Sequence, residues 1–180
     1  MRLRTVTLIF LGMSLRAAAP GQDLEEYQVK AAFLYNFAKF VEWPAQAFLA
    51  PQDSFAVCVL GRNPFGNALQ EALRGKSIEG RAFALRQVTD ADQANACQIL
   101  FVAAAESKRY RVLCRSLKPV GILTIGEALG FAAAGGVINF KLEDGRVRFE
   151  INAGAAERAQ LQISSKLLSL AQIVRTEKLP

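Results

Sequence analysis

The chain contains 180 residues, of which 52% are hydrophobic and 21% are charged, and its formal net charge is +6. This length and composition favour one globular domain and exclude an intrinsically disordered chain. The sequence contains no histidine. This excludes histidine-assisted serine or cysteine triads, histidine general bases and metal sites with histidine ligands.

The N-terminal segment 1–21 has the layout of a secretory signal peptide. Basic residues precede an apolar run from Val6 to Leu15, and small residues follow it. The run is shorter than the roughly 20 residues that a membrane-spanning helix needs. Cleavage after Ala19 would place Pro20 directly after the cut, where proline is unfavourable. We therefore prefer cleavage after Gly21. An uncleaved anchor or a buried helix is the alternative.

Loss of this segment would change the charge of the chain. It would lower the 22 basic residues to 19 against 16 acidic residues, so the net charge of the mature chain would be about +3. No run of lysines and arginines remains, which argues against nucleic-acid binding. We therefore expect a single domain over residues 22–180 that lies outside the cytoplasm, without stable insertion into a membrane.

An aromatic-rich segment, Glu25–Trp43, is predicted to be a helix that ends before Pro44. One helical stripe of this segment carries Phe33, Phe37 and Phe40. A second apolar stripe lies beside the first, whereas a surface helix usually has only one. We favour deep packing of both stripes, with an interface on the second stripe as the alternative.

The middle of the chain alternates predicted strands and helices. The predicted strands are 55–61, 83–88, 98–102 and 121–125, and the predicted helices run from Asn63 to Leu73 and over 91–96 and 107–117. This alternation indicates a three-layer, Rossmann-like α/β domain with a mostly parallel sheet. In such a sheet the first of these strands lies between the second and the third.

The last third of the chain is predicted to contain a β-hairpin and a final helix. Asp144-Gly145 separates two alternating runs, 136–143 and 146–152, which is a strong hairpin signal. A two-residue turn places all the apolar side chains on one face, but it also places Lys141 opposite Arg148. Glu143 and Glu150 lie diagonal to these two cations and can relieve their repulsion. A helix is expected from Ser164 or Ser165 to Val174, with Leu167, Leu168, Ala171 and Val174 on its buried face.

The sequence contains no complete motif for catalysis or for nucleotide binding. Gly61 and Gly66 flank a loop where doubly wound folds bind phosphates, but the remaining residues of a P-loop or dinucleotide motif are missing. A capped turn is the favoured interpretation, and a ligand crevice lined by Gly61, Arg62 and Asn63 is the alternative. The acidic pairs are placed in predicted caps and turns. We therefore predict no enzyme activity, no cofactor and no metal site.

The chain has three cysteines, Cys58, Cys97 and Cys114. Cys58 lies in the predicted strand 55–61, and Cys97 lies at the start of the predicted strand 98–102. A disulfide between these neighbouring strands is one interpretation. The other is that all three are small buried hydrophobic residues. The spacing alone does not decide between them.

Three stretches together form a recognisable pattern. They are residues 31–44 (AAFLYNFAKFVEWP), 57–66 (VCVLGRNPFG), and 147–152 (VRFEIN) with 161–171 (LQISSKLLSLA). With them the chain resembles the YfiR-like family of small exported bacterial proteins over essentially its whole mature length. Cys58 and Cys97 match a disulfide-forming pair of that family. A second pair late in the chain has no counterpart here, and Cys114 is extra.

The resemblance implies a regulatory function. The best-studied members are periplasmic repressors that bind the periplasmic sensor domain of an inner-membrane diguanylate cyclase, hold its cyclase domain inactive and lower cyclic di-GMP. Their release, linked to envelope redox stress, promotes biofilm formation. A small-molecule-binding module that regulates another envelope receptor is the alternative function, and an enzyme that uses Asp, Glu or Lys alone is the weakest hypothesis.

Two apolar surfaces are candidates for the contact with such a partner. The candidate residues are Leu34, Tyr35 and Val41 on the aromatic helix and Leu161, Ile163 and Leu167 near the C-terminus. Either group could instead be core or the seam of a homodimer, and the sequence does not rank these alternatives.

Overall fold

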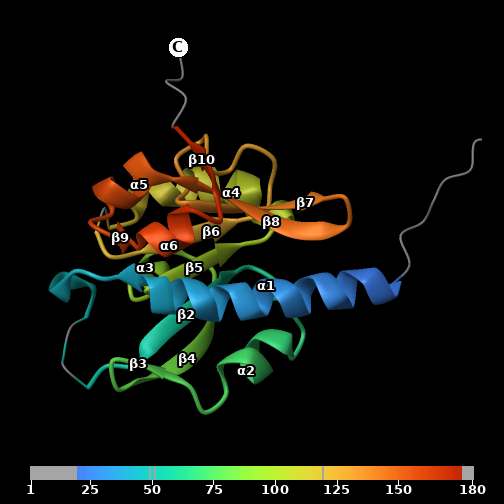
Figure 1. Cartoon of the computed structure of the whole chain (residues 1–180). Coiled ribbons are helices and arrows are strands. Elements are labelled where there is room, and N and C mark those ends of the chain that lie inside the picture. The colour runs from blue at the N-terminus through green and yellow to red at the C-terminus, as the bar shows by residue number, and fades with distance from the viewer. Residues whose placement is uncertain (1–19, 49, 51, 119, 176–180) are drawn as a thin grey trace, which may run out of the picture.

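An eight-stranded sheet forms the centre of the domain (Figure 1), in a computed structural model that describes residues 20–48, 50, 52–118 and 120–175. The strands lie in the order β10-β8-β7-β6-β5-β2-β4-β3. Their bounds are β2 Phe55–Leu60, β3 Ser77–Ile78, β4 Arg81–Val88, β5 Ile99–Val102, β6 Leu123–Gly126, β7 Ile138–Glu143, β8 Arg146–Asn152 and β10 Gln172–Val174.

The centre of this sheet is parallel, as predicted. β2 pairs in parallel with β4 on one side and with β5 on the other. This confirms the prediction that strand 55–61 lies between strands 83–88 and 98–102. β5, β6 and β7 continue the parallel pairing. All six residues of β2 are buried, because helices cover both faces of the sheet.

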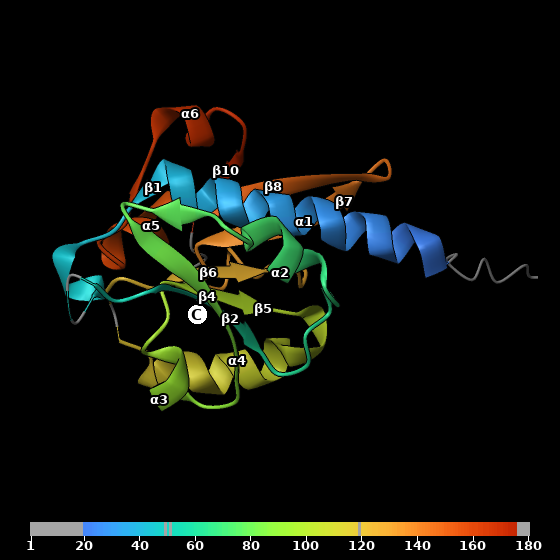
Figure 2. The same cartoon turned by 90° about the horizontal axis from the view of Figure 1, so that it is seen from below.

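Two layers of helices enclose the sheet (Figure 2). α1 (Pro20–Phe40) and α2 (Ala68–Leu73) lie on one side of it, and α3 (Ala91–Ala94) and α4 (Ser107–Leu113) lie on the other. Each face has its own apolar cluster. In the larger cluster, the ring of Phe37 of α1 lies 5.7 Å by centroid from that of Phe140 and 5.1 Å from that of Phe149, both in the hairpin. Both apolar stripes of α1 pack here, which confirms the favoured deep packing.

The N-terminal helix differs from its predicted range. Its first two residues are the last two of the predicted signal peptide 1–21, and the rest of that segment lies outside the described residues. α1 ends at Phe40 rather than at Trp43, and Val41–Glu42 forms strand β1, which pairs antiparallel with β9 (Gln162–Ile163). Pro44 disfavours helical backbone just before it, and the pairing with β9 satisfies the backbone of the freed residues.

The β7–β8 hairpin has the predicted register. Glu143 pairs with Arg146, Phe140 with Phe149, and Lys141 lies opposite Arg148. The Lys141 Nζ contacts Glu143 at 2.9 Å and Glu150 at 3.3 Å, so the expected relief of repulsion is confirmed. Hydrogen bonds to these two carboxylates raise the pKa of Lys141.

The C-terminal segment corrects a prediction. α6 spans only Ser165–Leu168, and Gln172–Val174 forms edge strand β10, parallel to β8, instead of continuing a helix to Val174. Ile173 and Val174 are β-branched, and the open edge of β8 offers them backbone hydrogen bonds that a helix end lacks. α5 (Ala153–Arg158), which follows β8 directly, was not predicted; Asn152 caps it by accepting a hydrogen bond from the backbone N–H of Ala155 at 2.9 Å.

Candidate functional site

A disulfide joins Cys58 of β2 to Cys97, two residues before β5, with a Cα–Cα distance of 6.0 Å. Both half-cystines are buried, on the face of the sheet that α3 and α4 cover. The Gln98 N–H donates to the Ala56 carbonyl at 3.0 Å and aligns the two segments. Cys114 is a free and exposed thiol. The disulfide interpretation is therefore confirmed for Cys58 and Cys97.

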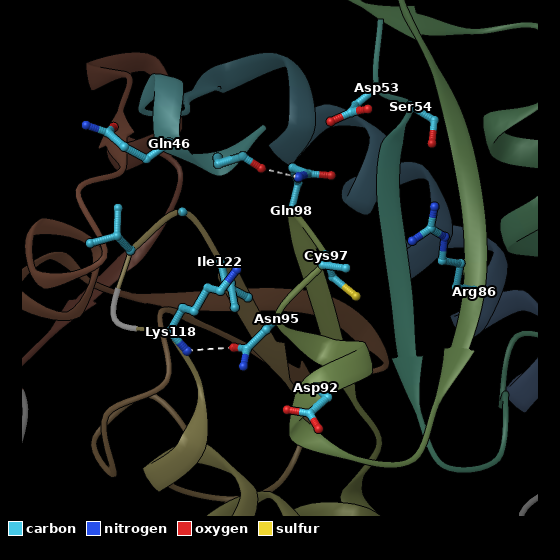
Figure 3. A pocket seen from close by; sticks show the side chains of 14 residues that line it. Gln46, Asp53, Ser54, Arg86, Asp92, Asn95, Cys97, Gln98, Lys118 and Ile122 are labelled. Carbon is cyan, nitrogen blue, oxygen red and sulfur yellow. Dashed lines mark hydrogen bonds between the residues drawn. The ribbon is translucent and has the colours of Figure 1, made fainter. Parts of the chain in front are cut away.

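A polar cavity of about 240 Å³ lies beside this disulfide, near the amino ends of β2, β5 and β6 (Figure 3). Gln98 forms part of its wall. The Gln98 Nε2 donates to the Ala47 carbonyl at 2.6 Å, and its Oε1 accepts from the Ala56 N–H at 2.7 Å. These bonds tie the segment before β2 and the first residues of β2 to the start of β5.

Charged side chains of both signs line the cavity. They are Asp53, Arg86, Asp92 and Lys118. In Figure 3, Arg86 projects from β4 and Asp92 from α3. Cys97 is also a lining residue, so a solute bound here would lie next to the disulfide. No sequence pattern predicts this cavity, because its lining residues come from separate strands, helices and loops with no shared motif.

The predicted crevice at Gly61, Arg62 and Asn63 lies at the opposite end of β2. Gly61 has φ of +73°, and a Cβ at this position would overlap the carboxylate of Glu106. Asn63 closes a turn: its Oδ1 accepts from the Phe65 N–H at 2.9 Å and its Nδ2 donates to the Gly66 carbonyl at 3.1 Å. Regular helix begins only at Ala68, rather than at Pro64 as predicted.

This geometry favours the capped turn over a phosphate site. The Glu106 carboxylate occupies the space beside Gly61, and its negative charge opposes an anion there. Ligand binding by Gly61, Arg62 and Asn63 stays a prediction.

A buried ion cluster lies at the carboxyl ends of β5 and β6. The Lys30 Nζ of α1 contacts Glu26 and Glu127, each at 2.5 Å. The Glu127 Oε1 also accepts from the Tyr27 hydroxyl at 3.0 Å and from the Ala104 N–H at 3.1 Å. Lys30 and Glu127 keep only 6% and 8% of their side-chain surface exposed. The cluster therefore fastens α1 to the loops after β5 and β6.

The six predicted partner-binding residues divide into two groups. Leu34, Val41, Leu161 and Leu167 are core residues, between 0% and 4% exposed. This corrects their placement on a contact surface, because side chains without accessible area cannot touch a partner in this conformation. Tyr35 and Ile163 pack against the same core but stay partly exposed, and they remain candidates for a contact.

Tyr110 of α4 supplies a pH-dependent prediction. Burial raises its pKa to about 12, although a hydrogen bond with Thr124 acts in the opposite direction. Between pH 10 and about 12 the tyrosine ionises in the unfolded chain but stays protonated in the folded one. The free energy of unfolding should therefore fall by about 2–3 kcal/mol over this window, and not below it.

The variant Tyr110→Phe should lack this alkaline loss, because it has no hydroxyl to ionise. The measurement is urea unfolding followed by Trp43 fluorescence at pH 8, 10, 11 and 12. Equal alkaline slopes in the two proteins would contradict the assignment to Tyr110.

Within the described residues, no group of three or more His, Cys, Asp or Glu side chains could hold a metal ion. None of the helices in the described part of the chain is long and apolar enough to cross a membrane.

These features define a doubly wound α/β domain with a buried disulfide. Residues 27–172 match the sequence model of the DUF4154 family, described as YfiR/HmsC-like, and the chain belongs to this family. The family is one of periplasmic regulators of diguanylate cyclases. No curated protein matches the chain.

A solved structure supports the fold. The ABC domain from Streptococcus pneumonia, solved in complex with L-Trp, superposes with a TM-score of 0.54 at 10% sequence identity. The match covers 83% of this chain and 60% of that one. The chain thus spans less than two thirds of that neighbour's length, and at this identity the likeness shows the α/β fold alone.

Proposed function

We propose that this protein is a periplasmic binding protein that represses an inner-membrane diguanylate cyclase by binding its periplasmic sensor domain, and so lowers cyclic di-GMP. Membership of the YfiR/HmsC-like family over residues 27–172 is the observation that carries the proposal. The buried Cys58–Cys97 disulfide supports a location outside the cytoplasm, where such bonds persist.

Repression of this kind needs no catalytic group in the binding protein. It needs a higher affinity for the inactive state of the receptor than for the active state. A preference of about 5.5 kcal/mol would move the receptor from almost fully active to almost fully inactive.

The test is a pull-down with mature protein Gln22–Pro180 from the solubilised envelope of its own host, followed by mass spectrometry. We expect a membrane protein with a periplasmic sensor and a cytoplasmic cyclase domain. Deletion of the gene should raise cyclic di-GMP, and the wild-type gene should restore the lower level. Recovery of no cyclase, together with unchanged cyclic di-GMP, would refute the proposal.

The polar cavity beside Cys97 favours a second candidate, a small-molecule-binding module. Two acidic and two basic side chains line its 240 Å³, which suits a small polar solute that carries charge. A bound solute would stabilise the folded state and raise Tm. Thermal-shift screening of polar metabolites tests this candidate, with Arg86→Ala as the variant expected to lose the shift. The two functions are compatible, since the solute could be the signal that changes affinity for the receptor.

A further inference from the structure

The outer edge of β4 is unpaired over most of its length. β4 runs from Arg81 to Val88, but its edge neighbour β3 pairs only with Arg81 and Ala82. Among the described residues no strand pairs with the remainder on that side. In Figures 1 and 2, β4 and β3 form this margin of the sheet, with α2 nearby. An edge of this kind can accept an additional strand.

The direction of the free backbone groups follows from one hydrogen bond. The Val88 carbonyl accepts from the Gly61 N–H at 3.0 Å, so Val88 directs its backbone groups toward β2. Successive residues of a strand alternate in this direction. Phe83, Leu85 and Gln87 therefore direct their N–H and C=O groups outward, away from β2.

A groove of about 600 Å³ lies next to these outward groups. It is bounded by β4 on one side and by α2 and the segment that follows it on the other. Leu73, Phe83 and Leu85 are its large apolar lining residues. Leu85 is 37% exposed, so the groove presents apolar side chains to solvent beside a free strand edge. A strand edge and a helix that flank one groove form a common binding arrangement for extended peptides.

The positive charge of the groove favours a segment that carries acidic residues. Arg74 and Lys76 line it, and no acidic residue does. Neither cation has an ion-pair partner within the described part of the chain. The Lys76 Nζ lies 4.0 Å from the centroid of the Tyr35 ring, which holds its charge at this site. Carboxylates on an incoming segment would pair with these two cations.

We propose that an extended segment of a partner protein, with apolar and acidic residues, adds to β4 as a further strand and occupies this groove. The backbone of the segment would pair with Phe83, Leu85 and Gln87, and its carboxylates with Arg74 and Lys76. This inference deepens the proposed function and rests on it where the partner is the cyclase sensor. It also gives Tyr35 a role, because the ring positions one of the two cations.

A backbone variant with a matched side-chain control tests the strand pairing. Leu85→Pro removes the outward N–H without touching the bonds to β2, whereas Leu85→Ala keeps the N–H and shortens the side chain. Proline is tolerated on edge strands where the N–H faces outward. We expect Leu85→Pro to lower cyclase recovery in the pull-down by about tenfold or more, and Leu85→Ala to lower it far less. Circular dichroism and Tm identify any variant that fails to fold.

A defined probe tests the groove without the cyclase. The probe is a fluorescein-labelled octapeptide of alternating valine and glutamate, with a valine–lysine octapeptide as the charge control. We expect fluorescence anisotropy to show binding of the glutamate peptide only, and amide hydrogen exchange to slow at Phe83, Leu85 and Gln87. The variant Arg74→Glu/Lys76→Glu should reverse the preference between the peptides.

The outcomes separate the two proposals. Peptide binding with slowed exchange, but no cyclase in the pull-down and unchanged cyclic di-GMP after gene deletion, supports the groove and refutes the repression of a cyclase. Cyclase recovery that Leu85→Pro and Arg74→Glu/Lys76→Glu leave unchanged, with no slowed exchange at millimolar peptide, overturns the groove and leaves the repressor function standing. A wild-type dimer that Leu85→Pro converts to a monomer in light scattering assigns the edge to a second copy and also overturns the groove.

Discussion

Replacement of both Cys58 and Cys97 by alanine should lower the free energy of unfolding by roughly 3–4 kcal/mol. The bond closes a loop with a sequence separation of 39 residues, and loss of this cross-link returns conformational entropy to the unfolded chain. The replaced sulfurs also leave the buried cluster on the α3 and α4 side of the sheet. Urea unfolding followed by circular dichroism at neutral pH measures the loss.

Cys114→Ala is the matched control, because this thiol is exposed and outside the bond. It should change the free energy of unfolding by less than about 0.5 kcal/mol. Reductant should lower the stability of the wild type and of Cys114→Ala by similar amounts and should not affect the double variant. A double variant as stable as the wild type would show that the bond contributes nothing to stability.

Lys30→Ala should lower the free energy of unfolding at least as much, with an expected loss of about 3–5 kcal/mol. The variant leaves the Glu127 carboxylate, with 8% of its side chain exposed, without its cation. It also removes the Lys30 contact between α1 and the loop after β6, where the hydrogen bond from the Tyr27 hydroxyl to Glu127 remains. Chemical unfolding at pH 7 measures the loss, and Glu26→Gln serves as the control because Glu26 is more exposed, at 22%.

The double variant Lys30→Met/Glu127→Gln separates the cost of an unpaired charge from the loss of packing. In Lys30→Ala the Glu127 carboxylate stays buried without a cation beside it. Replacement of both charged groups by neutral groups of similar size removes this unpaired charge. We expect it to recover most of the lost stability. If the double variant were as unstable as Lys30→Ala, the loss would come from packing rather than from charge.

The hairpin shows which parts of the fold are predictable from sequence. Asp144-Gly145 fixes the turn, the turn fixes the register, and the register places Lys141 opposite Arg148 with the two glutamates in reach. Each step depends on residues close in sequence. The central strands were equally predictable, because continuous apolar runs alternated with capped helices.

Elements that depend on distant pairing were not predictable. The apolar pattern that predicted a C-terminal helix serves equally well for a short helix followed by strand β10, and only the free edge of β8 decides between them. β1 and β9 each have two residues and form only because they meet. Such pairings carry no local signal that a sequence pattern could detect.

The same limit explains the outcome for the candidate site. The two apolar stripes of residues 25–43 make Leu34 and Val41 candidates, but the sequence cannot show that the sheet and the C-terminal segment cover both stripes. Lys30 and Glu127 lie 97 positions apart, and neither residue alone suggests a buried ion pair. Cys58 and Cys97 were identified through the resemblance, where strand position alone left two alternatives.

For the expected export of the chain, the position of the disulfide also bears on the order in which its cysteines meet. In a chain that crosses a membrane from its N-terminus, Cys58 and Cys97 enter the oxidising compartment before Cys114 does. The native pair can therefore form while the third thiol is still on the reducing side. In the folded domain the bond is buried, so Cys114 has little access to attack it there. Vectorial delivery, rather than any difference in thiol chemistry, would thus keep the odd cysteine out of wrong bonds.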